Sequence, residues 1–291
     1  MGILDALFGK RVPKTDIKQR FELVGRVGHG TMSEFWRAHD RTSGRTLGVK
    51  ILDREQTKKF EARFPGLNKP TEGEIALTLQ HPHVVKTIEH GITTDGRQFL
   101  VMEFIEGALL AELIKNRDDQ LRENRLRYMI ELGEAISHIH EKNYIYRDLC
   151  PRNVMISDES GVKLIDFGLV VPNTAEFRRP GNRTGTANYM APELMRRRPT
   201  DQRIDLFSYG VTCFEICSGR LPWDRAKARE AVLQHAGPPM DLREAAPDIE
   251  PDVAKVIMRG VEVDRDRRWQ SAREMTAALR QATGVGEGET G

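Results

Sequence analysis

The segment Tyr146-Arg147-Asp148-Leu149-Cys150-Pro151-Arg152-Asn153 decides how this chain is interpreted. It is followed by Asp166-Phe167-Gly168 and, further on, by Ala191-Pro192-Glu193. The first two motifs supply carboxylate and amide oxygens, which are the hard ligands that suit Mg²⁺. Each motif alone could arise by chance. The three together, in this order, are a far more specific signal.

These motifs resemble the eukaryotic-type, or Hanks-type, Ser/Thr protein kinase family over roughly residues 20 to 280. The resemblance implies an α+β, bilobal fold, with a small antiparallel-sheet N-lobe carrying one main helix and a larger, mostly helical C-lobe. We expect a leader at residues 1–19, the N-lobe at 20–104, the C-lobe at 105–282 and a disordered, glycine-rich tail at 283–291. By analogy, the motifs suit a bacterial member.

The amino-terminal part of the chain has the pattern of a sheet. Alternating apolar positions predict strands over residues 21–27, 35–38 and 46–52. Gly28 and Gly30 lie between the first two strands, where a hairpin tip could cover phosphates with its backbone N–H groups. A strand follows these glycines, whereas a dinucleotide-binding Rossmann unit needs a helix there, so we set that alternative aside.

Lys50 is the candidate phosphate-binding lysine. It ends Leu47-Gly48-Val49-Lys50, which resembles the lysine motif of the third kinase strand, and the apolar residues of this strand share the opposite face. By the spacing of the family, Glu72 in the next helix pairs with Lys50 and places it on the α- and β-phosphates. Glu74 is the rival partner, but it points away from the apolar face of its helix.

The resemblance implies a wider nucleotide site. Ser33 replaces the third loop glycine of the family, and Phe35 takes the place of a valine over the adenine. Residues 100–107 match the hinge, where Met102 is the gatekeeper. The implied ATP-binding residues are Val27, Gly28, Gly30, Phe35, Gly48, Lys50, Glu72, Met102, Glu103, Ile105 and Met155.

The resemblance also assigns the catalytic roles. Asp148 accepts the hydrogen bond of the substrate hydroxyl, and Asn153 and Asp166 hold Mg²⁺. Cys150 stands where Ser/Thr kinases carry a γ-phosphate lysine, and a reactive thiol is an alternative role for it. Uncompensated loss of such a charge costs roughly two to three powers of ten in rate. Arg152 could take over, as an arginine before the asparagine does in tyrosine kinases. The implied catalytic set is Asp148, Lys50, Arg152, Asn153 and Asp166.

Residues 168–193 resemble an activation segment of the Ser/Thr type, so we expect protein Ser/Thr hydroxyls as substrates, with Thr186 lining the acceptor site. Arg147 is typical of kinases that are switched by phosphorylation of this segment. Thr184 is the first candidate acceptor and Thr174 the second. The fold-holding and phosphate-binding expectations are a Glu193–Arg268 pair, Tyr146 packed on Phe167, Asp205 anchoring the catalytic loop, and Arg178, Arg179 and Arg183 around a phosphate.

Two functions therefore remain open. The leading hypothesis is Mg-ATP-dependent phosphoryl transfer to proteins, including autophosphorylation of the activation segment. The alternative is a pseudokinase that binds nucleotide or acts as a scaffold, which Ser33, Gly48 and Cys150 favour. A small-molecule kinase is weakened by the full activation segment.

Composition narrows the remaining classes. Lys plus Arg is 45 and Asp plus Glu is 43, a net charge of +2, which argues against a dedicated nucleic-acid binder. The three cysteines form no disulfide framework and no CxxC motif, so a reducing cytoplasm is expected. No apolar run reaches the length of about 18 residues that an integral membrane span needs. The expected partners are ATP and protein substrates, and the oligomeric state stays open.

Overall fold

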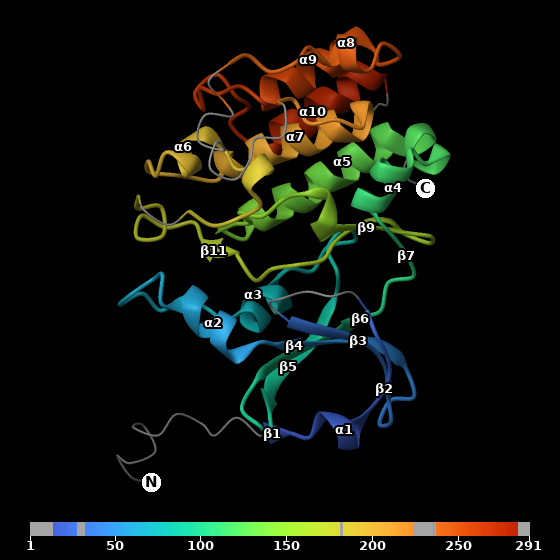
Figure 1. The fold of residues 1–291 in the computed structure, drawn as a ribbon, viewed down its shortest axis with the longest axis vertical. Coiled ribbons are helices and arrows are strands. Elements are labelled where there is room, and N and C mark those ends of the chain that lie inside the picture. Colours follow the sequence, from blue (N-terminus) through green and yellow to red (C-terminus); the bar gives the residue numbers. More distant parts are fainter. Residues whose placement is uncertain (1–13, 28–32, 181–182, 224–234, 236, 285–291) are drawn as a thin grey trace. The chain divides into compact units, whose positions relative to one another are not determined.

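The computed structural model describes residues 14–27, 33–180, 183–223, 235 and 237–284 (Figure 1). Gly28 and Gly30, most of the expected leader and most of the tail lie outside these residues. The chain forms two compact units. The N-terminal unit contains the residues up to Thr78 and Lys86–Ile105, and the C-terminal unit contains Leu79–Val85 and the residues from Glu106 onward.

The N-terminal unit is built on one sheet in the order β1-β5-β6-β4-β3-β2. Its strands are β1 (Lys14–Thr15), β2 (Phe21–Arg26), β3 (Ser33–Asp40), β4 (Thr46–Leu52), β5 (Thr87–Thr93) and β6 (Gln98–Glu103). The pair of β1 with β5 is parallel, and the other pairs are antiparallel. Leu47, Val49 and Ile51 of β4 enter one apolar core, as their shared face predicted.

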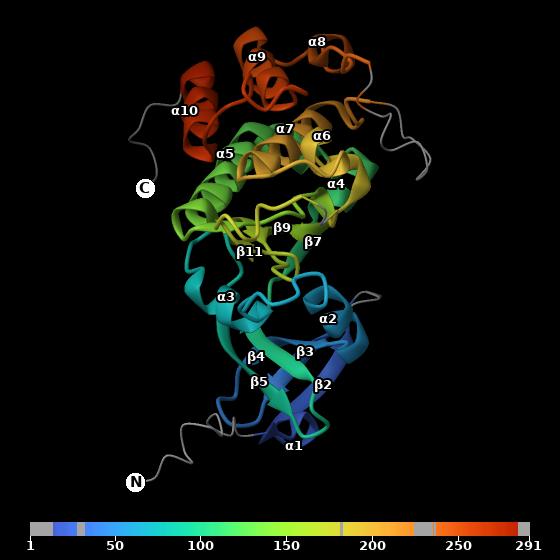
Figure 2. The same cartoon turned by 90° about the vertical axis from the view of Figure 1, so that its left-hand side faces the viewer.

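The described residues add three helices to this sheet: α1 (Ile17–Arg20), α2 (Arg54–Glu61) and α3 (Glu72–Thr78). Figure 1 and Figure 2 both show α2 and α3 on the same side of the sheet. One main helix was expected, and α3 is in the expected place. The additional α2 has Asp53 as its N-cap, which accepts a hydrogen bond from the backbone of Gln56.

The expected leader of residues 1–19 is too long at its carboxyl end. Lys14 and Thr15 pair with Ile92 and Thr93 of β5, and Ile17 is buried in the core of the sheet. Residues 14–19 therefore belong to the N-terminal unit, because this short strand completes the edge beyond β5.

The expected continuous N-lobe of residues 20–104 is interrupted. The backbone N–H of Val85 donates to the carbonyl of Leu164 (2.9 Å), and Leu164 donates to the carbonyl of His83 (3.0 Å). The ring of His81 stacks on that of His138, with 5.0 Å between centroids. These long-range contacts place Leu79–Val85 in the C-terminal unit. The last residue of the N-terminal unit is Ile105, one position beyond the expected limit.

The C-terminal unit is mostly helical. Its helices are α4 (Leu110–Asn116), α5 (Asp119–Glu141), α6 (Pro192–Met195), α7 (Arg203–Ser218), α8 (Leu242–Ala245), α9 (Pro251–Gly260) and α10 (Ala272–Thr283). Two small sheets join β7 (Gly107–Leu109), β9 (Val154–Ser157) and β10 (Gly161–Leu164), and β8 (Tyr144–Ile145) with β11 (Val171–Pro172). Short 3₁₀ turns cover Pro151–Asn153 and Ala187–Tyr189.

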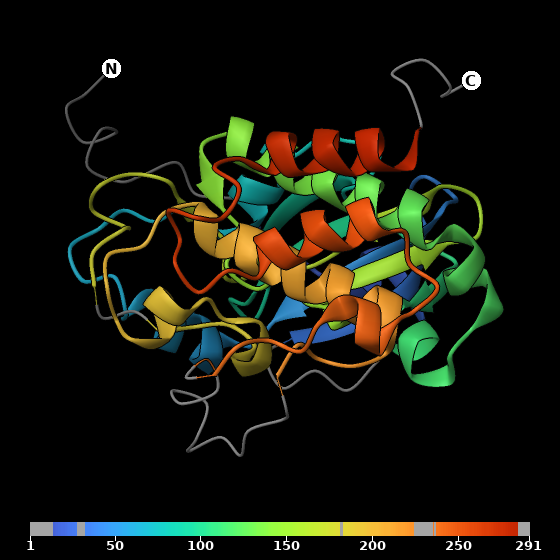
Figure 3. The ribbon, with the colours of Figure 1, turned by 90° about the horizontal axis from the view of Figure 1, so that it is seen from above.

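Helix α7 is the centre of this unit, and its residues from Ile204 to Ile216 are buried. It packs against α5 and α9, and α10 covers α5 and α9 (Figure 3). Gly210 of α7 meets Gly260 of α9 so closely that a β-carbon on Gly210 would lie 2.7 Å from the carbonyl carbon of Gly260. Two glycines are therefore required where the helices cross. Helix α5 confirms the helical periodicity of residues 123–142 and starts earlier, behind its N-cap Asp118.

Candidate active site

The N-terminal unit holds the predicted lysine–glutamate pair. Lys50 Nζ lies 2.5 Å from Glu72 Oε1, and both side chains are buried. The rival Glu74 instead accepts hydrogen bonds from the backbone N–H (2.8 Å) and hydroxyl (2.9 Å) of Thr71 at the start of α3. A buried ammonium group needs such a partner, so the pair fixes where Lys50 lies on the sheet.

The predicted adenine-binding residues of β3, β4 and β6 pack together. A β-carbon on Gly48 would lie 2.7 Å from Cζ of Phe35 and 3.2 Å from Cγ of Met102. The backbone N–H of Val27 donates to the carbonyl of Phe35 (2.8 Å). The side chain of Val27 is exposed. Phe35, Gly48 and Met102 thus form one continuous surface.

The predicted hinge starts where β6 ends. The backbone N–H of Glu103 donates to the carbonyl of Lys86 (3.0 Å), and its carboxylate accepts the Lys86 N–H (2.9 Å). Ile105 follows outside the strand. Its backbone N–H and carbonyl have no hydrogen-bond partner within the described part of the chain. They are therefore available to a ligand.

In the C-terminal unit, Asp205 of α7 anchors the catalytic loop, as predicted. Its carboxylate accepts the backbone N–H groups of Tyr146 and Arg147, both at 2.8 Å, and also contacts His140 Nε2 at 2.8 Å. Arg147 has a φ of 73°, which is rare for a residue other than glycine. The two bonds to one fully buried carboxylate hold the loop in this conformation.

Asp148 is oriented by two neighbours. Its Oδ1 accepts the backbone N–H (2.7 Å) and the hydroxyl (2.8 Å) of Thr186. Asn153 Nδ2 donates to its Oδ2 (3.0 Å) and to its carbonyl (2.8 Å). Burial raises the pKa of Asp148 and the charge of Asp166 adds to this, while the bonds from Thr186 and Asn153 oppose it. The carboxylate is thus poised to accept a proton or a hydrogen bond.

Asn153 and Asp166 have a donor set that fits Mg²⁺. Because Nδ2 of Asn153 is turned toward Asp148, its side-chain carbonyl oxygen points elsewhere. The backbone N–H of Ile165 donates to the carbonyl of Asn153 (3.0 Å), which brings the neighbouring Asp166 to the same loop. Tyr146 and Phe167 meet edge to face, 6.3 Å between centroids, as predicted.

Within the described ranges, no three His, Cys, Asp or Glu side chains gather as a metal site. One carboxylate and one amide oxygen leave most positions of an octahedral ion to water and phosphate oxygens, which is how Mg²⁺ is usually bound. Asn153 and Asp166 therefore suit an Mg²⁺ ion whose other ligands come from a nucleotide and water.

Cys150 and Arg152 both reach Thr186. Cys150 is 1% exposed, and its Sγ lies 3.6 Å from Thr186 Oγ1. Burial, and then the charge of Asp148, raise the pKa of this thiol, which argues against the alternative of a reactive thiolate. Arg152 Nη2 donates to the same Thr186 hydroxyl (3.4 Å). A positive charge is thus present beside the acceptor position.

The predicted regulatory residues differ in burial and in their hydrogen-bond partners. Thr184 is buried, and its hydroxyl has no partner among the described residues. The hydroxyl of Thr174 donates to Glu176 Oε2 (2.6 Å). Arg178 donates to the side-chain and backbone oxygens of Asn173 (2.8 and 3.1 Å). Arg178 is therefore already hydrogen-bonded, whereas Arg179 is exposed. The regulatory roles of Arg147, Thr174 and Thr184 stay predictions.

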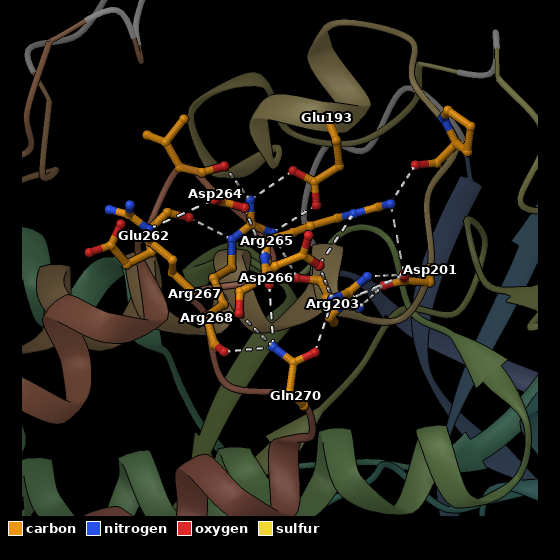
Figure 4. A network of polar contacts seen from close by, with 12 residues as sticks. Glu193, Asp201, Arg203, Glu262, Asp264, Arg265, Asp266, Arg267, Arg268 and Gln270 are labelled. Carbon is orange, nitrogen blue, oxygen red and sulfur yellow. Dashed lines mark hydrogen bonds and ion pairs between the residues drawn. The ribbon is translucent and has the colours of Figure 1, made fainter.

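The end of the activation segment is fixed to the core. Glu193 and Arg268 form a buried bidentate pair with both distances at 2.7 Å, as predicted (Figure 4). Two anchors were not predicted: the Tyr189 hydroxyl donates to Glu215, and Ser208 Oγ donates to the Tyr189 carbonyl (2.7 Å). No local sequence signal identifies either contact, because the partners are far apart in the chain.

The sheet unit with its buried lysine–glutamate pair and the helical unit with its aspartate–threonine site are the two parts of a protein kinase fold. The chain belongs to the protein kinase domain family, whose family model matches residues 21–279. This confirms the resemblance and the predicted fold class. The described helices include none that is long and apolar enough to cross a membrane.

The chain is similar to several bacterial proteins. It is 31% identical to a "Probable serine/threonine-protein kinase" of Streptomyces coelicolor, over 88% of this chain and 39% of that protein. It is 34% identical to the serine/threonine-protein kinase pkn2 of Myxococcus xanthus, over 89% and 32%. It is 28% identical to the serine/threonine-protein kinase PrkC of Bacillus subtilis, over 95% and 42%. The chain thus spans less than half the length of these relatives.

Proposed function

We propose that this chain catalyses Mg-ATP-dependent phosphoryl transfer to Ser and Thr hydroxyls of proteins. One observation carries the proposal: the Asp148 carboxylate already receives the hydroxyl of a threonine, Thr186, at 2.8 Å. A substrate hydroxyl has the same chemistry, so this carboxylate is suited to align it and to take its proton. Thr186 lines the acceptor site in this proposal.

Each unit supplies phosphate-binding residues of the family pattern. In the N-terminal unit, Glu72 holds Lys50 so that its charge can meet the α- and β-phosphates. In the C-terminal unit, Asn153 and Asp166 would hold Mg²⁺ through an amide oxygen and a carboxylate. The ion, when bound, neutralises phosphate charge. Gly28 and Gly30, which lie outside the described residues, would cover the phosphates.

The adenine would meet Val27, Phe35, Gly48 and Met102, and its edge would bond to the unpaired backbone groups of Ile105. The Glu103 carbonyl is the neighbouring acceptor. Met155 of β9 is half-buried, and the family pattern gives it an apolar role in nucleotide binding. These roles follow the family pattern, residue by residue.

Arg152 would neutralise the γ-phosphate in place of the lysine that Cys150 replaces. The distance of 3.4 Å from Arg152 to the Thr186 hydroxyl supports this, because that hydroxyl is bonded to Asp148. A guanidinium group presents several N–H donors in one plane and binds phosphate well. Cys150 then acts as a small buried filler.

The relatives named Ser/Thr kinases support an enzyme, and they give no support to the pseudokinase alternative. We further propose a cytoplasmic signalling role with protein substrates, and autophosphorylation at Thr174 or Thr184 assisted by Arg147. A balanced net charge of +2 fits protein partners better than nucleic acid.

The test is transfer of label from Mg-ATP to generic protein acceptors. The purified chain is compared with Asp148→Asn and Asp166→Ala. Transfer that is lost in both variants supports the proposal. Nucleotide binding without transfer at any enzyme concentration would refute it in favour of a pseudokinase.

A further inference from the structure

Three consecutive arginines follow α6, and we call Arg196, Arg197 and Arg198 the arginine patch. We propose that this patch binds acidic side chains of the protein substrate near its Ser or Thr acceptor. The proposal rests on the proposed kinase function and adds a substrate class to it. All three residues are exposed. Within the described part of the chain, none of their guanidinium groups has a hydrogen bond or ion pair.

Two of these arginines line a cavity of about 500 Å³. Arg196, Arg198 and Arg265 contribute basic groups to its wall, and Glu193, Asp264 and Asp266 contribute acidic ones. By residue type alone, the positive and negative charges of the wall therefore cancel. Its effective charge depends on which of these groups are already paired.

The acidic groups of the wall are paired with residues outside it (Figure 4). Both oxygens of Glu193 accept from Arg268 at 2.7 Å. Asp266 Oδ1 accepts from Arg203 Nη1 (2.8 Å), and Asp264 Oδ2 lies 3.8 Å from Arg267 Nε. The remaining charge of the cavity is thus positive, because Arg196 and Arg198 have no such partners.

Arg197 occupies a position that normally favours glycine. Its backbone N–H donates to Leu194 (3.2 Å) and that of Arg198 donates to Glu193 (2.9 Å), and its φ is 54°. These are the two bonds of a Schellman helix end, where a left-handed residue stands at the first position beyond the cap. A glycine would adopt this conformation without strain. An arginine here therefore costs more in folding than a glycine would, which supports a role for its side chain.

The segment between the acceptor position and the patch is held to α7 by hydrogen bonds. Tyr189, between Thr186 and α6, is bonded to Ser208 and Glu215 of α7. A substrate segment of ten residues spans at most about 35 Å, which is also the greatest possible chain length from Thr186 to Arg196. The hydrogen bond from Thr200 N–H to the Arg178 carbonyl (3.0 Å) brings the exposed Arg179 into the same region.

The experiment compares peptides that share one serine acceptor and carry four glutamates or four alanines within ten residues of it, on either side. Both kcat/KM and binding by fluorescence anisotropy are measured at low and high salt. For the wild-type chain we expect at least a tenfold preference for one acidic peptide, which weakens as salt screens the charges. The double variant Arg196→Gln Arg198→Gln should lose this preference and keep its rate on the alanine peptide.

Two further variants separate recognition from folding. Arg197→Gly should resist urea better than the wild type and still bind the acidic peptide more weakly. Arg273→Gln, at an exposed arginine of α10, should leave the preference unchanged.

Equal kcat/KM and equal binding for the two kinds of peptide in the wild type would overturn the proposal. So would a preference that survives in the double variant, or an oligonucleotide of equal charge that competes as well as the acidic peptide. If no peptide is phosphorylated, the kinase function fails, and the patch is then judged on binding alone. Loss of acidic-peptide binding in the double variant then supports the proposed role of the patch, and unchanged binding overturns that role.

Discussion

The ring of Phe35 fills the space beside Gly48 where any other residue would place its β-carbon, since that carbon would lie 2.7 Å from Phe35 Cζ. The kinase pattern has a small valine and an alanine at these two positions. Here the first residue is larger and the second is smaller, so the two departures compensate each other. Gly48, which favoured a pseudokinase when considered alone, is explained by packing.

Gly48→Ala should therefore destabilise the chain by about 1 kcal/mol, because overpacking costs roughly 1–3 kcal/mol and the loss of a strand glycine returns some of it. Adding Phe35→Val should restore stability and nucleotide binding to the wild-type level or above. Urea denaturation of the two single variants and the double variant measures the coupling. Additive effects would show that the residues do not depend on each other.

The bonds from Thr186 to Asp148 predict how activity depends on pH. Hydrogen bonds to the carboxylate lower its pKa, against the burial that raises it. Thr186→Ala removes the hydroxyl donor, so the acidic limb of kcat/KM should move to higher pH. Thr186→Ser retains the donor and should leave the limb in place. A limb that is identical in all three proteins would contradict the assignment of Asp148.

The same raised pKa has a consequence for stability. Folded Asp148 binds a proton more tightly than unfolded Asp148, so its contribution to stability is greatest at low pH and is lost as pH rises through the folded pKa. Asp148→Asn should therefore be inactive but more resistant to urea at neutral pH, with the gain shrinking toward acid. Urea titrations at several pH values test this sign, and a gain that is largest in acid would refute it.

Arg152→Ala should lower kcat by roughly two to three powers of ten, because it removes the charge beside the acceptor site. Cys150→Lys alone should give equal or higher turnover, and it should recover most of the activity lost in Arg152→Ala. Single-turnover assays separate this effect from binding. A collapse of activity in Cys150→Lys would instead show that the thiol has a role of its own.

Glu193→Ala should destabilise the C-terminal unit by about 3–5 kcal/mol, because it leaves the fully buried guanidinium of Arg268 without its partner. The exposed pair Asp252–Lys255 is the matched control, and Asp252→Ala should not change the free energy of unfolding measurably. Equal losses in the two variants would contradict this account of the buried pair.

The sequence predicted strand limits and residue pairs correctly where the local pattern and the family spacing agree. The strand Thr46–Leu52 has the predicted limits. Lys50 meets Glu72, Thr186 meets Asp148, and Glu193 meets Arg268. In each of these cases a motif specifies the residue type and its spacing, and the fold leaves little choice of partner.

Prediction failed where structure depends on distant partners. Helix α2 is mostly polar and buries only Phe60, so it carries no clear apolar periodicity. The placement of Leu79–Val85 depends on hydrogen bonds to Leu164, and the capture of Arg178 depends on Asn173. Neither partner is indicated by spacing or by composition.

The buried hydroxyl of Thr184 has a consequence for how such a chain would be activated. A second kinase molecule cannot reach an acceptor that is enclosed in this way. If Thr184 is the residue modified, each event must wait for the surrounding backbone to open transiently, however fast the attacking enzyme is. The tightness of its own packing would then set the delay before the enzyme switches on.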